Sequence, residues 1–300
     1  MNRTRRILAA LMAALVLLSL TACGSSSATA ETAPAAAAEP AAEADLGSGV
    51  EDGVLTVAME CAYAPYNWAQ TDDANGAVPI KGSNLYANGY DVMMARKLCE
   101  ANGWELEVVQ LDWDSLIPAV MSGSVDAVIA GQSMTAERME SVDFAGPYLY
   151  ATIVCLALEG SDYASAAGKS DLSGATATSQ TGTIWYDNCL PQIEGINVAT
   201  AAETAPAMLM ALETGTVDIV CTDRPTAQAA LIAYPDMVLL DFAGSGDDFE
   251  VSDEEINIGI SLRKDNAELR TALDGVLSEM TADDFNALMD EAIRIQPLDA

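Results

Sequence analysis

The 300-residue sequence contains no histidine and few basic residues of any kind. Histidine is the commonest general base and the commonest metal ligand, so its absence argues against most hydrolase mechanisms. Lys and Arg together number 13 against 45 Asp and Glu, which gives a net charge of −32. Because nucleic-acid binding needs clustered basic side chains to neutralise phosphates, nucleic acid is not an expected partner.

None of the six cysteines belongs to a C-x-x-C pair, so zinc is not expected and no other cofactor is indicated. The five that follow residue 23 are Cys61, Cys99, Cys155, Cys189 and Cys221. Because five is odd, at least one thiol stays free unless pairing is intermolecular. We interpret most of them as small buried hydrophobic residues and leave disulfides open.

Residues 1–22 have the pattern of a secretory signal peptide. Three arginines precede the apolar run Ile7–Leu20, which is too short to span a bilayer. The run ends in Leu20-Thr21-Ala22-Cys23, which resembles the lipobox of bacterial lipoproteins. There the chain is cut before the cysteine, which then carries lipid. We expect acyl chains on Cys23, palmitate among them, to anchor the protein to the extracytoplasmic face of the cell membrane. A signal peptide without lipidation is the alternative.

Residues 24 to about 49 are mainly Ala, Glu, Ser, Thr and Pro. Such a stretch cannot bury a core, so residues 23–49 are expected to be a lipidated cysteine followed by a disordered spacer.

Strand and helix patterns alternate in the next part of the chain. We expect strands at Val54–Met59, Leu106–Leu111 and Val125–Ala130, with helices at Tyr90–Asn102 and Leu116–Met121 between them. This order is typical of a parallel sheet with right-handed crossovers.

The remaining part continues the α/β pattern. We expect a helix that begins near Gln180–Thr183, another at Ala205–Leu212, one at Asn266–Met280 and a shorter one at Asp283–Ala292. The expected strands are Ala151–Leu158, Ala175–Thr178, Val217–Cys221 and Ile256–Leu262.

Two stretches about ninety residues apart repeat one helix–Gly–strand pattern. Residues 119–131 align with residues 211–223, so that Gly123 matches Gly215, Asp126 matches Asp218 and Gly131 matches Asp223. The repeat predicts two α/β lobes, each presenting a strand end to a shared cleft. Asp126 and Asp218 begin their strands and are interpreted as structural. A return of the tail to the first lobe would make the chain cross near Ala151 and again near Glu255, as a hinge.

Three loops are candidate ligand contacts, each with an ordinary structural alternative. The polar loop Gly131–Thr135 follows a strand, and the nearby Arg138 can hold a carboxylate with two parallel hydrogen bonds. The aromatic loop Cys61–Trp68 is a stacking platform or simple packing. Backbone N–H groups at Gln180–Thr183 can hold an anion, or a Thr can merely cap the helix.

Several motifs in order resemble the family 3 extracellular solute-binding proteins, the receptors of polar amino-acid ABC importers. They are residues 88–92 (NGYDV), 112–118 (DWDSLIP), 131–138 (GQSMTAER), 142–148 (VDFAGPY) and 259–264 (GISLRK). The resemblance covers residues 54 to about 295. It implies an α/β fold of two lobes, a type II periplasmic-binding-protein-like clamshell with parallel-rich sheets and two hinge strands. Lobe 1 would comprise residues 50–150 plus 257–300, and lobe 2 residues 151–256.

The resemblance also implies roles at the site. Arg138 would take the α-carboxylate of an amino acid with the help of Ser133 and Thr183. Asp223 would take the α-ammonium together with the Gly131 carbonyl. Tyr63 and Trp113 would sandwich the ligand side chain. Whether Gln132, Arg224 or the loop at residues 70–88 selects that side chain stays open.

The expected function is therefore delivery of a polar amino acid to the permease of an ABC importer. We expect a monomer that is not an enzyme and touches the membrane only through its lipid anchor. One alternative is a dehydratase-like enzyme on the same fold, which would need a carboxyl of raised pKa, and only Asp223 is nominated by the motifs. The other alternative is a ligand-sensing module, because fold alone does not decide function.

Overall fold

The computed structural model describes residue 50 and residues 52–297. The predicted signal peptide, the predicted lipidation site Cys23 and the whole of the predicted spacer lie outside these residues. None of the helices within residues 52–297 combines the length and the apolar character needed to cross a membrane.

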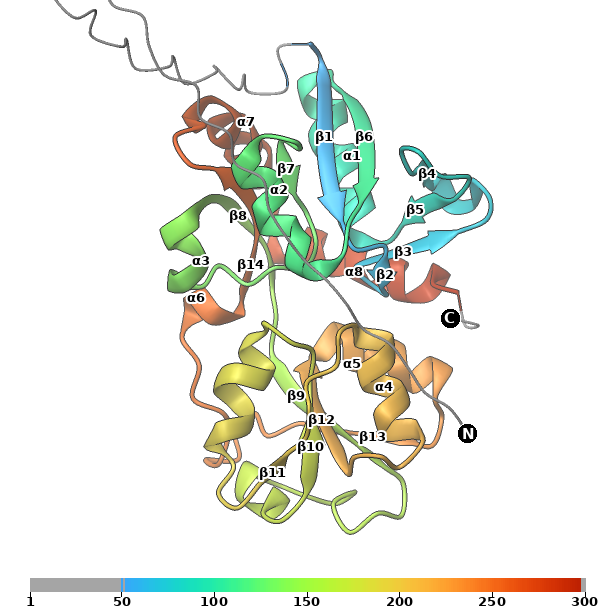
Figure 1. Cartoon of the computed structure of the whole chain (residues 1–300), viewed down its shortest axis with the longest axis vertical. Coiled ribbons are helices and arrows are strands. Elements are labelled where there is room, and N and C mark those ends of the chain that lie inside the picture. The colour runs from blue at the N-terminus through green and yellow to red at the C-terminus, as the bar shows by residue number, and fades with distance from the viewer. Residues whose placement is uncertain (1–49, 51, 298–300) are drawn as a thin grey trace, which may run out of the picture. The chain divides into compact units, whose positions relative to one another are not determined.

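The first sheet has five strands in the order β6-β1-β7-β14-β8. They are β6 (Glu105–Gln110), β1 (Val54–Met59), β7 (Ala127–Val128), β14 (Asn257–Arg263) and β8 (Val142–Tyr150). Strand β1 pairs in parallel with β6 and β7, whereas β14 runs antiparallel to β7 and β8 (Figure 1). The tail of the chain therefore returns to complete the sheet that the N-terminal half began.

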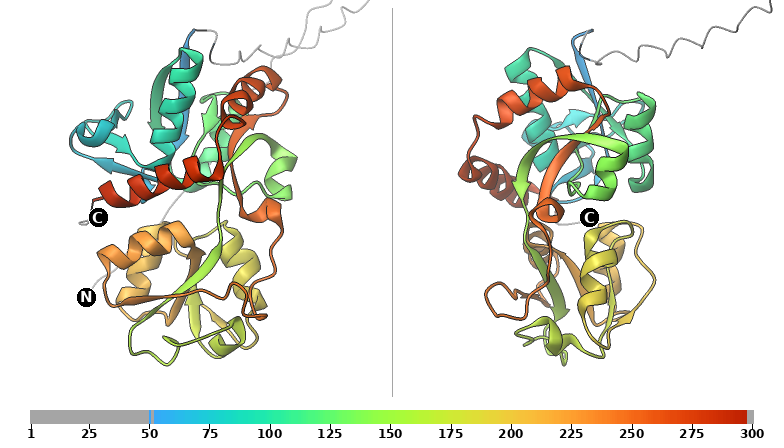
Figure 2. Two further views of the ribbon diagram at one scale, coloured as in Figure 1. Left: turned by 180° about the vertical axis from the view of Figure 1, so that it is seen from behind. Right: turned by 90° about the vertical axis from the view of Figure 1, so that its left-hand side faces the viewer.

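The second sheet also has five strands, in the order β11-β10-β12-β9-β13. They are β11 (Asn197–Val198), β10 (Thr176–Thr178), β12 (Ile219–Asp223), β9 (Ile153–Leu158) and β13 (Met237–Leu240). Strand β10 is parallel to β11 and β12, and β9 is antiparallel to β12 and β13. The part of the chain built on the first sheet is called the first lobe below, and the part built on the second sheet the second lobe. Two connections join them, β8 to β9 and β13 to β14 (Figure 2).

Residues 62–88 form a small antiparallel sheet that the sequence did not predict. Its order is β2 (Ala62–Tyr63), β3 (Asn67–Gln70), β5 (Tyr86–Asn88) and β4 (Val78–Pro79), and the 3₁₀ turn η1 (Ala74–Gly76) lies between β3 and β4. Strands of two to four residues are too short to show a period-2 pattern. The aromatic loop and the loop at residues 70–88 are thus both ordered by strand pairing.

Helices cover both sheets. Helix α1 (Tyr90–Asn102) has the predicted bounds and ends at Gly103, whose φ of 72° is the left-handed conformation that glycine adopts without strain. The other α-helices are α2 (Leu116–Ser122), α3 (Ala136–Ser141), α4 (Ala205–Glu213), α5 (Arg224–Ala233), α6 (Asp253–Ile256), α7 (Ala267–Leu277) and α8 (Ala282–Ile295). Four short non-α turns complete the set: η2 (Trp113–Ser115), η3 (Lys169–Leu172), η4 (Trp185–Cys189) and η5 (Leu190–Gln192).

Several expected elements differ in extent. Helix α8 has 14 residues and α7 has 11, so the expectation that the last helix is the shorter one was wrong. The strand expected at Val125–Ala130 pairs only over β7. The helix expected after Gln180–Thr183 is the five-residue π-helix η4. The last helix was expected to begin at Asp283, but α8 begins at Ala282. Its start is fixed by a capping box in which Thr281 and Asp284 bond reciprocally.

The internal repeat is visible in matching hydrogen bonds. Thr56 N donates to the Asp126 carboxylate over 2.8 Å, and Thr176 N donates to the Asp218 carboxylate over the same distance. Gly215 has a φ of 67°, and Gly123, its counterpart, has 73°. Each aspartate therefore bonds to the backbone of a neighbouring strand in its own lobe, Asp126 to β1 and Asp218 to β10, which is a structural role.

All five cysteines of the described residues are buried free thiols. Cys155 of β9 lies directly opposite Cys221 of β12 in the antiparallel register. Each of these thiols packs as a small apolar side chain.

Candidate functional site

The predicted site residues lie where strands of the two lobes end. Gly131 follows β7, and Asp223 is the last residue of β12 and also the N-cap of α5. Arg138 lies on α3, directly after the loop that follows β7, and Thr183 precedes η4. Carboxyl-terminal ends of parallel strands are the usual ligand edge of α/β sheets.

Asp223 is fully buried and accepts hydrogen bonds from both lobes. The Tyr66 hydroxyl donates to Asp223 Oδ2 over 2.7 Å, and the Tyr63 hydroxyl donates to the same oxygen over 3.2 Å. Thr226 N donates to Asp223 Oδ1 over 2.8 Å as the N-cap bond of α5. Burial raises the pKa of Asp223, and these hydrogen bonds oppose the increase.

Two tyrosines of the first lobe form the surface that meets Asp223. The rings of Tyr63 and Tyr66 stack with their centroids 4.7 Å apart and 16° between their planes. Gly131 packs beneath them with a φ of 63°, and a Cβ on this residue would lie 2.9 Å from Tyr63 Cε1 and 3.1 Å from Tyr66 Cδ1. Only glycine fits this position without moving a ring.

The buried carboxylate of Asp91 supports the backbone of Gly131 through Tyr148. Gly131 N donates to the Tyr148 hydroxyl over 3.0 Å, and that hydroxyl donates to Asp91 Oδ1 over 2.6 Å. Asn67 Nδ2 donates to Asp91 Oδ2 over 2.7 Å. Burial raises the pKa of Asp91 to about 6, although its hydrogen bonds with Tyr148 and Asn67 favour the charged form. The network holds the Gly131 backbone in place.

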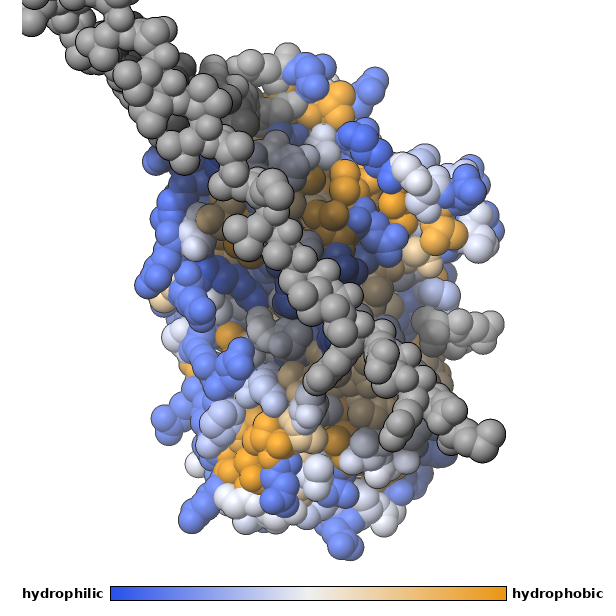
Figure 3. All heavy atoms as spheres, in the orientation of Figure 1, coloured by the Kyte–Doolittle hydropathy of each residue, from blue (hydrophilic) through white to orange (hydrophobic). Residues whose placement is uncertain are grey.

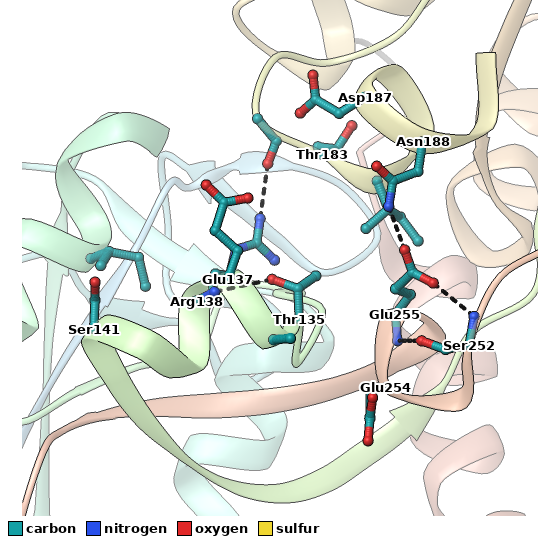
Figure 4. Close-up of a pocket in the computed structure, with 14 residues that line it drawn as sticks. Thr135, Glu137, Arg138, Ser141, Thr183, Asp187, Asn188, Ser252, Glu254 and Glu255 are labelled. Carbon is teal, nitrogen blue, oxygen red and sulfur yellow. Dashed lines mark hydrogen bonds between the residues drawn. The ribbon is translucent and has the colours of Figure 1, made fainter. Parts of the chain in front are cut away.

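Arg138 bridges the two lobes through its guanidinium. Its Nη1 donates to the Ser133 carbonyl over 2.8 Å. Its Nη2 donates to the Gly182 carbonyl over 2.9 Å (Figure 4). Its Cζ lies 5.5 Å from the ring centroid of Trp113, a cation–π distance. Burial lowers the pKa of Arg138 to about 10, so the group remains a cation at neutral pH.

Thr183 lies beside Arg138, but its hydroxyl has a local partner. Its Oγ1 donates to the Gln180 carbonyl over 2.7 Å and accepts a 3.4 Å bond from Tyr186 N. Thr183 and Arg138 line one cavity of about 490 Å³, together with Thr135 and Gly182 (Figure 4). Four acidic residues rim the same cavity: Glu137, Asp187, Glu254 and Glu255.

A second cavity, of about 300 Å³, has Trp113 in its wall. It is lined by Trp113, Ser115, Thr181 and Thr204 and by four acidic residues, Glu60, Asp112, Asp114 and Glu203. Neither cavity is lined by Asp223, Gly131 or Tyr63. The structure thus brings Ser133, Arg138, Trp113 and Thr183 together in one group and Tyr63, Gly131 and Asp223 in another.

The two residues considered for ligand selection have partners elsewhere. Gln132 is buried, and its Oε1 accepts a 2.7 Å hydrogen bond from Ser261 Oγ. Arg224 forms an ion pair with Asp241 and donates to Thr152 Oγ1 over 3.1 Å. Residues 70–88 contain the end of β3, strands β4 and β5 and the turns that connect them.

Four residues of the site were missed from the sequence: Glu60, Tyr66, Asp91 and Tyr148. Glu60 directly follows β1, so its place at the carboxyl end of a parallel strand was a usable signal. The roles of the other three depend on partners far along the chain, such as Tyr148 for Asp91, 57 residues away.

Comparison with known proteins agrees with this architecture. The sequence profile of the bacterial extracellular solute-binding proteins, family 3, matches residues 55–293. The chain belongs to this family.

Individual members of the family are similar over much of the chain. A probable histidine-binding protein of Campylobacter jejuni subsp. jejuni is 30% identical over 184 residues, which cover 61% of this chain and 65% of that protein. The L-cystine-binding protein TcyJ of Escherichia coli (strain K12) is 26% identical over 233 residues, 78% of this chain and 79% of that protein. Among solved structures, the arginine-bound form of truncated ArgBP from T. maritima superposes with a TM-score of 0.62 at 27% identity. That match covers 78% of this chain and 99% of the truncated ArgBP chain.

These relatives confirm the predicted family and the two-lobe α/β fold of this family 3 solute-binding protein. The family and its solved neighbours are binding proteins. The names of these relatives specify different amino acids, so family membership does not identify a ligand.

Proposed function

We propose that the protein is the extracytoplasmic substrate-binding protein of an ABC importer and that it binds an amino acid between its two lobes for delivery to a membrane permease. The relatives named for histidine, cystine and arginine support an amino acid as the ligand class. Residues 50–150 with 257–300 would form one lobe and residues 151–256 the other, in line with the strands of the two sheets.

The observation that carries the proposal is that a half-buried cation and a buried anion each make hydrogen bonds across the lobes. Arg138 of the first lobe donates to Gly182 of the second, and Asp223 of the second lobe accepts from Tyr63 and Tyr66 of the first. An α-amino acid carries a carboxylate for Arg138 and an ammonium for Asp223 on one carbon. Such charge-assisted hydrogen bonds are short and directional.

The other predicted residues complete this arrangement. Ser133 and Thr183 would assist Arg138 with the carboxylate, and the Gly131 carbonyl would accept from the ammonium. Trp113 would contact the ligand side chain, because its ring already packs against Arg138. Tyr63 would contact the ligand side chain on the face opposite Trp113. Its ring would stay in contact with Gly131 and its hydroxyl would stay bonded to Asp223. A ligand that touches both lobes favours the closed arrangement through contacts that an open one lacks.

A thermal-shift screen of the purified protein against all common amino acids tests the proposal, with calorimetry on each hit. A ligand of the native state raises the melting temperature as its concentration exceeds the dissociation constant. Arg138→Ala and Asp223→Ala should each abolish the shift, and circular dichroism verifies that both variants are folded. If no amino acid raises the melting temperature, the proposal that the ligand is an amino acid is contradicted.

We also propose that Cys23 carries the lipid anchor that keeps the protein on the membrane. The sequence Leu20-Thr21-Ala22-Cys23 supports it. Metabolic labelling with a palmitate analogue should mark the wild-type protein and leave Cys23→Ser unlabelled, with the variant released from the membrane fraction. Labelling of the serine variant would contradict this assignment.

A further inference from the structure

Three of the five described cysteines meet in the core of the second lobe. Cys155 of β9 lies directly opposite Cys221 of β12, so the two side chains share one face of the sheet. Cys189 is the last residue of η4, which packs against β12. All three side chains are fully buried, and the thiol of Cys221 lies next to the thiols of both other residues. We call these three residues the thiol cluster.

The other two described cysteines have different surroundings. Cys61 and Cys99 belong to the first lobe. Burial raises the pKa of both thiols, and the neighbours that raise it further are carboxylates. Burial also raises the pKa of Cys221, but here the neighbours that raise it further are two thiols. Proximity of sulfur to sulfur therefore distinguishes the thiol cluster from Cys61 and Cys99.

The location of the family makes thiols in contact significant. The solute-binding proteins to which this chain belongs are extracellular. Disulfides form and persist outside the cytoplasm, where thiols are not kept reduced. Neighbouring thiols that the fold holds together in such a protein are therefore candidates for a covalent bond.

Of the two neighbours of Cys221, Cys189 is the better partner. Residues directly opposite each other in an antiparallel pair have Cβ atoms about 4.5–5.5 Å apart, whereas a disulfide needs about 3.5–4.5 Å. The pairing of β9 with β12 continues on both sides of Cys155, so it resists drawing that residue closer. Cys189 lies outside the sheet, and a small shift of η4 brings its sulfur to Cys221 without disturbing the strands.

We propose that Cys189 and Cys221 form a disulfide as the chain folds outside the cytoplasm, with Cys155 left as a free thiol beside it. The oxidant is an external disulfide, either a small molecule such as oxidised glutathione or the active disulfide of a protein oxidant. One thiolate of the chain attacks a sulfur of this disulfide and releases one thiol, and the second thiolate attacks the mixed disulfide and releases the other. The two cysteines lose two electrons and two protons, and the oxidant becomes two thiols.

The bond forms before the second lobe has closed around the thiol cluster. Only a thiolate attacks a disulfide, and the folded lobe keeps Cys221 protonated and away from solvent. Once formed, the bond joins η4, which begins two residues after Thr183, to β12, which ends at Asp223. It thereby ties together the two elements of the second lobe that carry proposed ligand contacts.

Refolding in a glutathione redox buffer tests the inference. The purified protein is reduced, unfolded in urea and refolded either with a mixture of reduced and oxidised glutathione or with excess reductant. Each sample is then alkylated in denaturant and digested without reduction by a glutamate-specific protease. Such a protease can cut at Glu159 and Glu194 and so separates Cys155, Cys189 and Cys221 into different peptides, whereas no Lys or Arg lies between Cys189 and Cys221.

Mass spectrometry and thermal denaturation then give two independent readouts. The peptides of Cys189 and Cys221 should be joined, and two hydrogen atoms lighter than their sum, only after refolding with oxidised glutathione. The same sample should melt about 5 to 15 °C higher than the reduced one, because the bond closes a loop in the unfolded chain.

Three alanine variants identify the pairing. Each is compared with itself under the two refolding conditions, so that the effect of the missing side chain cancels. Cys189→Ala should lose both the joined peptides and the difference in melting temperature, and Cys155→Ala should keep both. Cys99→Ala is the matched control, because it removes a buried thiol of the first lobe, and it should also keep both.

Two results in the wild-type protein would overturn the inference, whether or not any variant folds. One is a bond between Cys155 and Cys221 in place of the proposed pair. The other is alkylation of all five described cysteines after refolding with oxidised glutathione.

Discussion

The hydroxyl of Tyr66 donates a 2.7 Å hydrogen bond to the carboxylate of Asp223, although the two residues belong to different lobes and lie 157 positions apart. Both side chains are fully buried. Asp223 is the residue proposed to take the ligand's ammonium, so the first lobe already supplies donors to the anionic end of the site. The contact links the packing of the two lobes to a residue proposed to bind ligand.

Tyr66→Phe should therefore destabilise the protein. The substitution removes one donor from a buried carboxylate and leaves the ring packing against Tyr63 unchanged, so we expect a loss of about 1 to 3 kcal/mol in the free energy of unfolding at neutral pH. Urea denaturation measures it. Tyr150→Phe is a suitable control, because Tyr150 is 56% exposed. Equal stability of the two variants would mean that the Tyr66 hydroxyl contributes nothing to holding Asp223.

Gly131→Ala should damage the site through the same two tyrosines. A new Cβ would meet the Tyr63 and Tyr66 rings at 2.9 and 3.1 Å, closer than such atoms normally approach. Gly103→Ala is the matched control, because Gly103 has a similar φ of 72° but nothing within 4 Å of the added Cβ. Both variants carry the strain of a left-handed conformation, about 1 kcal/mol.

The difference between the two glycine variants isolates the contact with the rings. Overpacking should make Gly131→Ala less stable than Gly103→Ala by about 1 to 3 kcal/mol in thermal or urea denaturation. Only Gly131→Ala should also weaken amino-acid binding in calorimetry. The same stability and affinity in both variants would show that the Tyr63 and Tyr66 rings can move away from the added Cβ with no loss of stability or binding.

The fold was largely predictable where local patterns are long. Strand β1 and helix α1 have the expected bounds, because each is a continuous apolar or periodic run and Gly103 marks where the helix ends. The small sheet at residues 62–88 was not predictable in this way, because its strands have two to four residues and exist only through pairing with one another. Local sequence carries no periodic signal for such strands.

The site was predictable only in part, for a similar reason. The motifs around them nominate Arg138, Asp223 and Thr183 as candidate ligand contacts. Motifs do not reveal that Tyr66 reaches Asp223 or that the Asp91 carboxylate supports Gly131 through Tyr148, because these contacts depend on how distant segments pack. Sequence also does not reveal that the buried Glu60 Oε1 has no hydrogen-bond partner among the described residues, because this depends on the packing around it.

The raised pKa of Glu60 predicts how stability depends on pH in the absence of ligand. The pKa of its carboxyl is 4.5 in an unfolded chain and about 7 in the folded protein. Between these values the folded state binds more protons, so stability falls as the pH rises from about 4.5 to about 7. The contribution of Glu60 should be about 3 kcal/mol, most of it lost over that window.

Comparison with Glu60→Gln isolates this contribution from that of the other carboxyls. Urea denaturation at pH 5 and at pH 7.5 should show the wild type losing more stability than the variant between the two values. Asp112, Asp114 and Glu203 face the same cavity and are present in both proteins, so their effects largely cancel in the difference. Parallel pH profiles of the two proteins would mean that Glu60 is already ionised at pH 5.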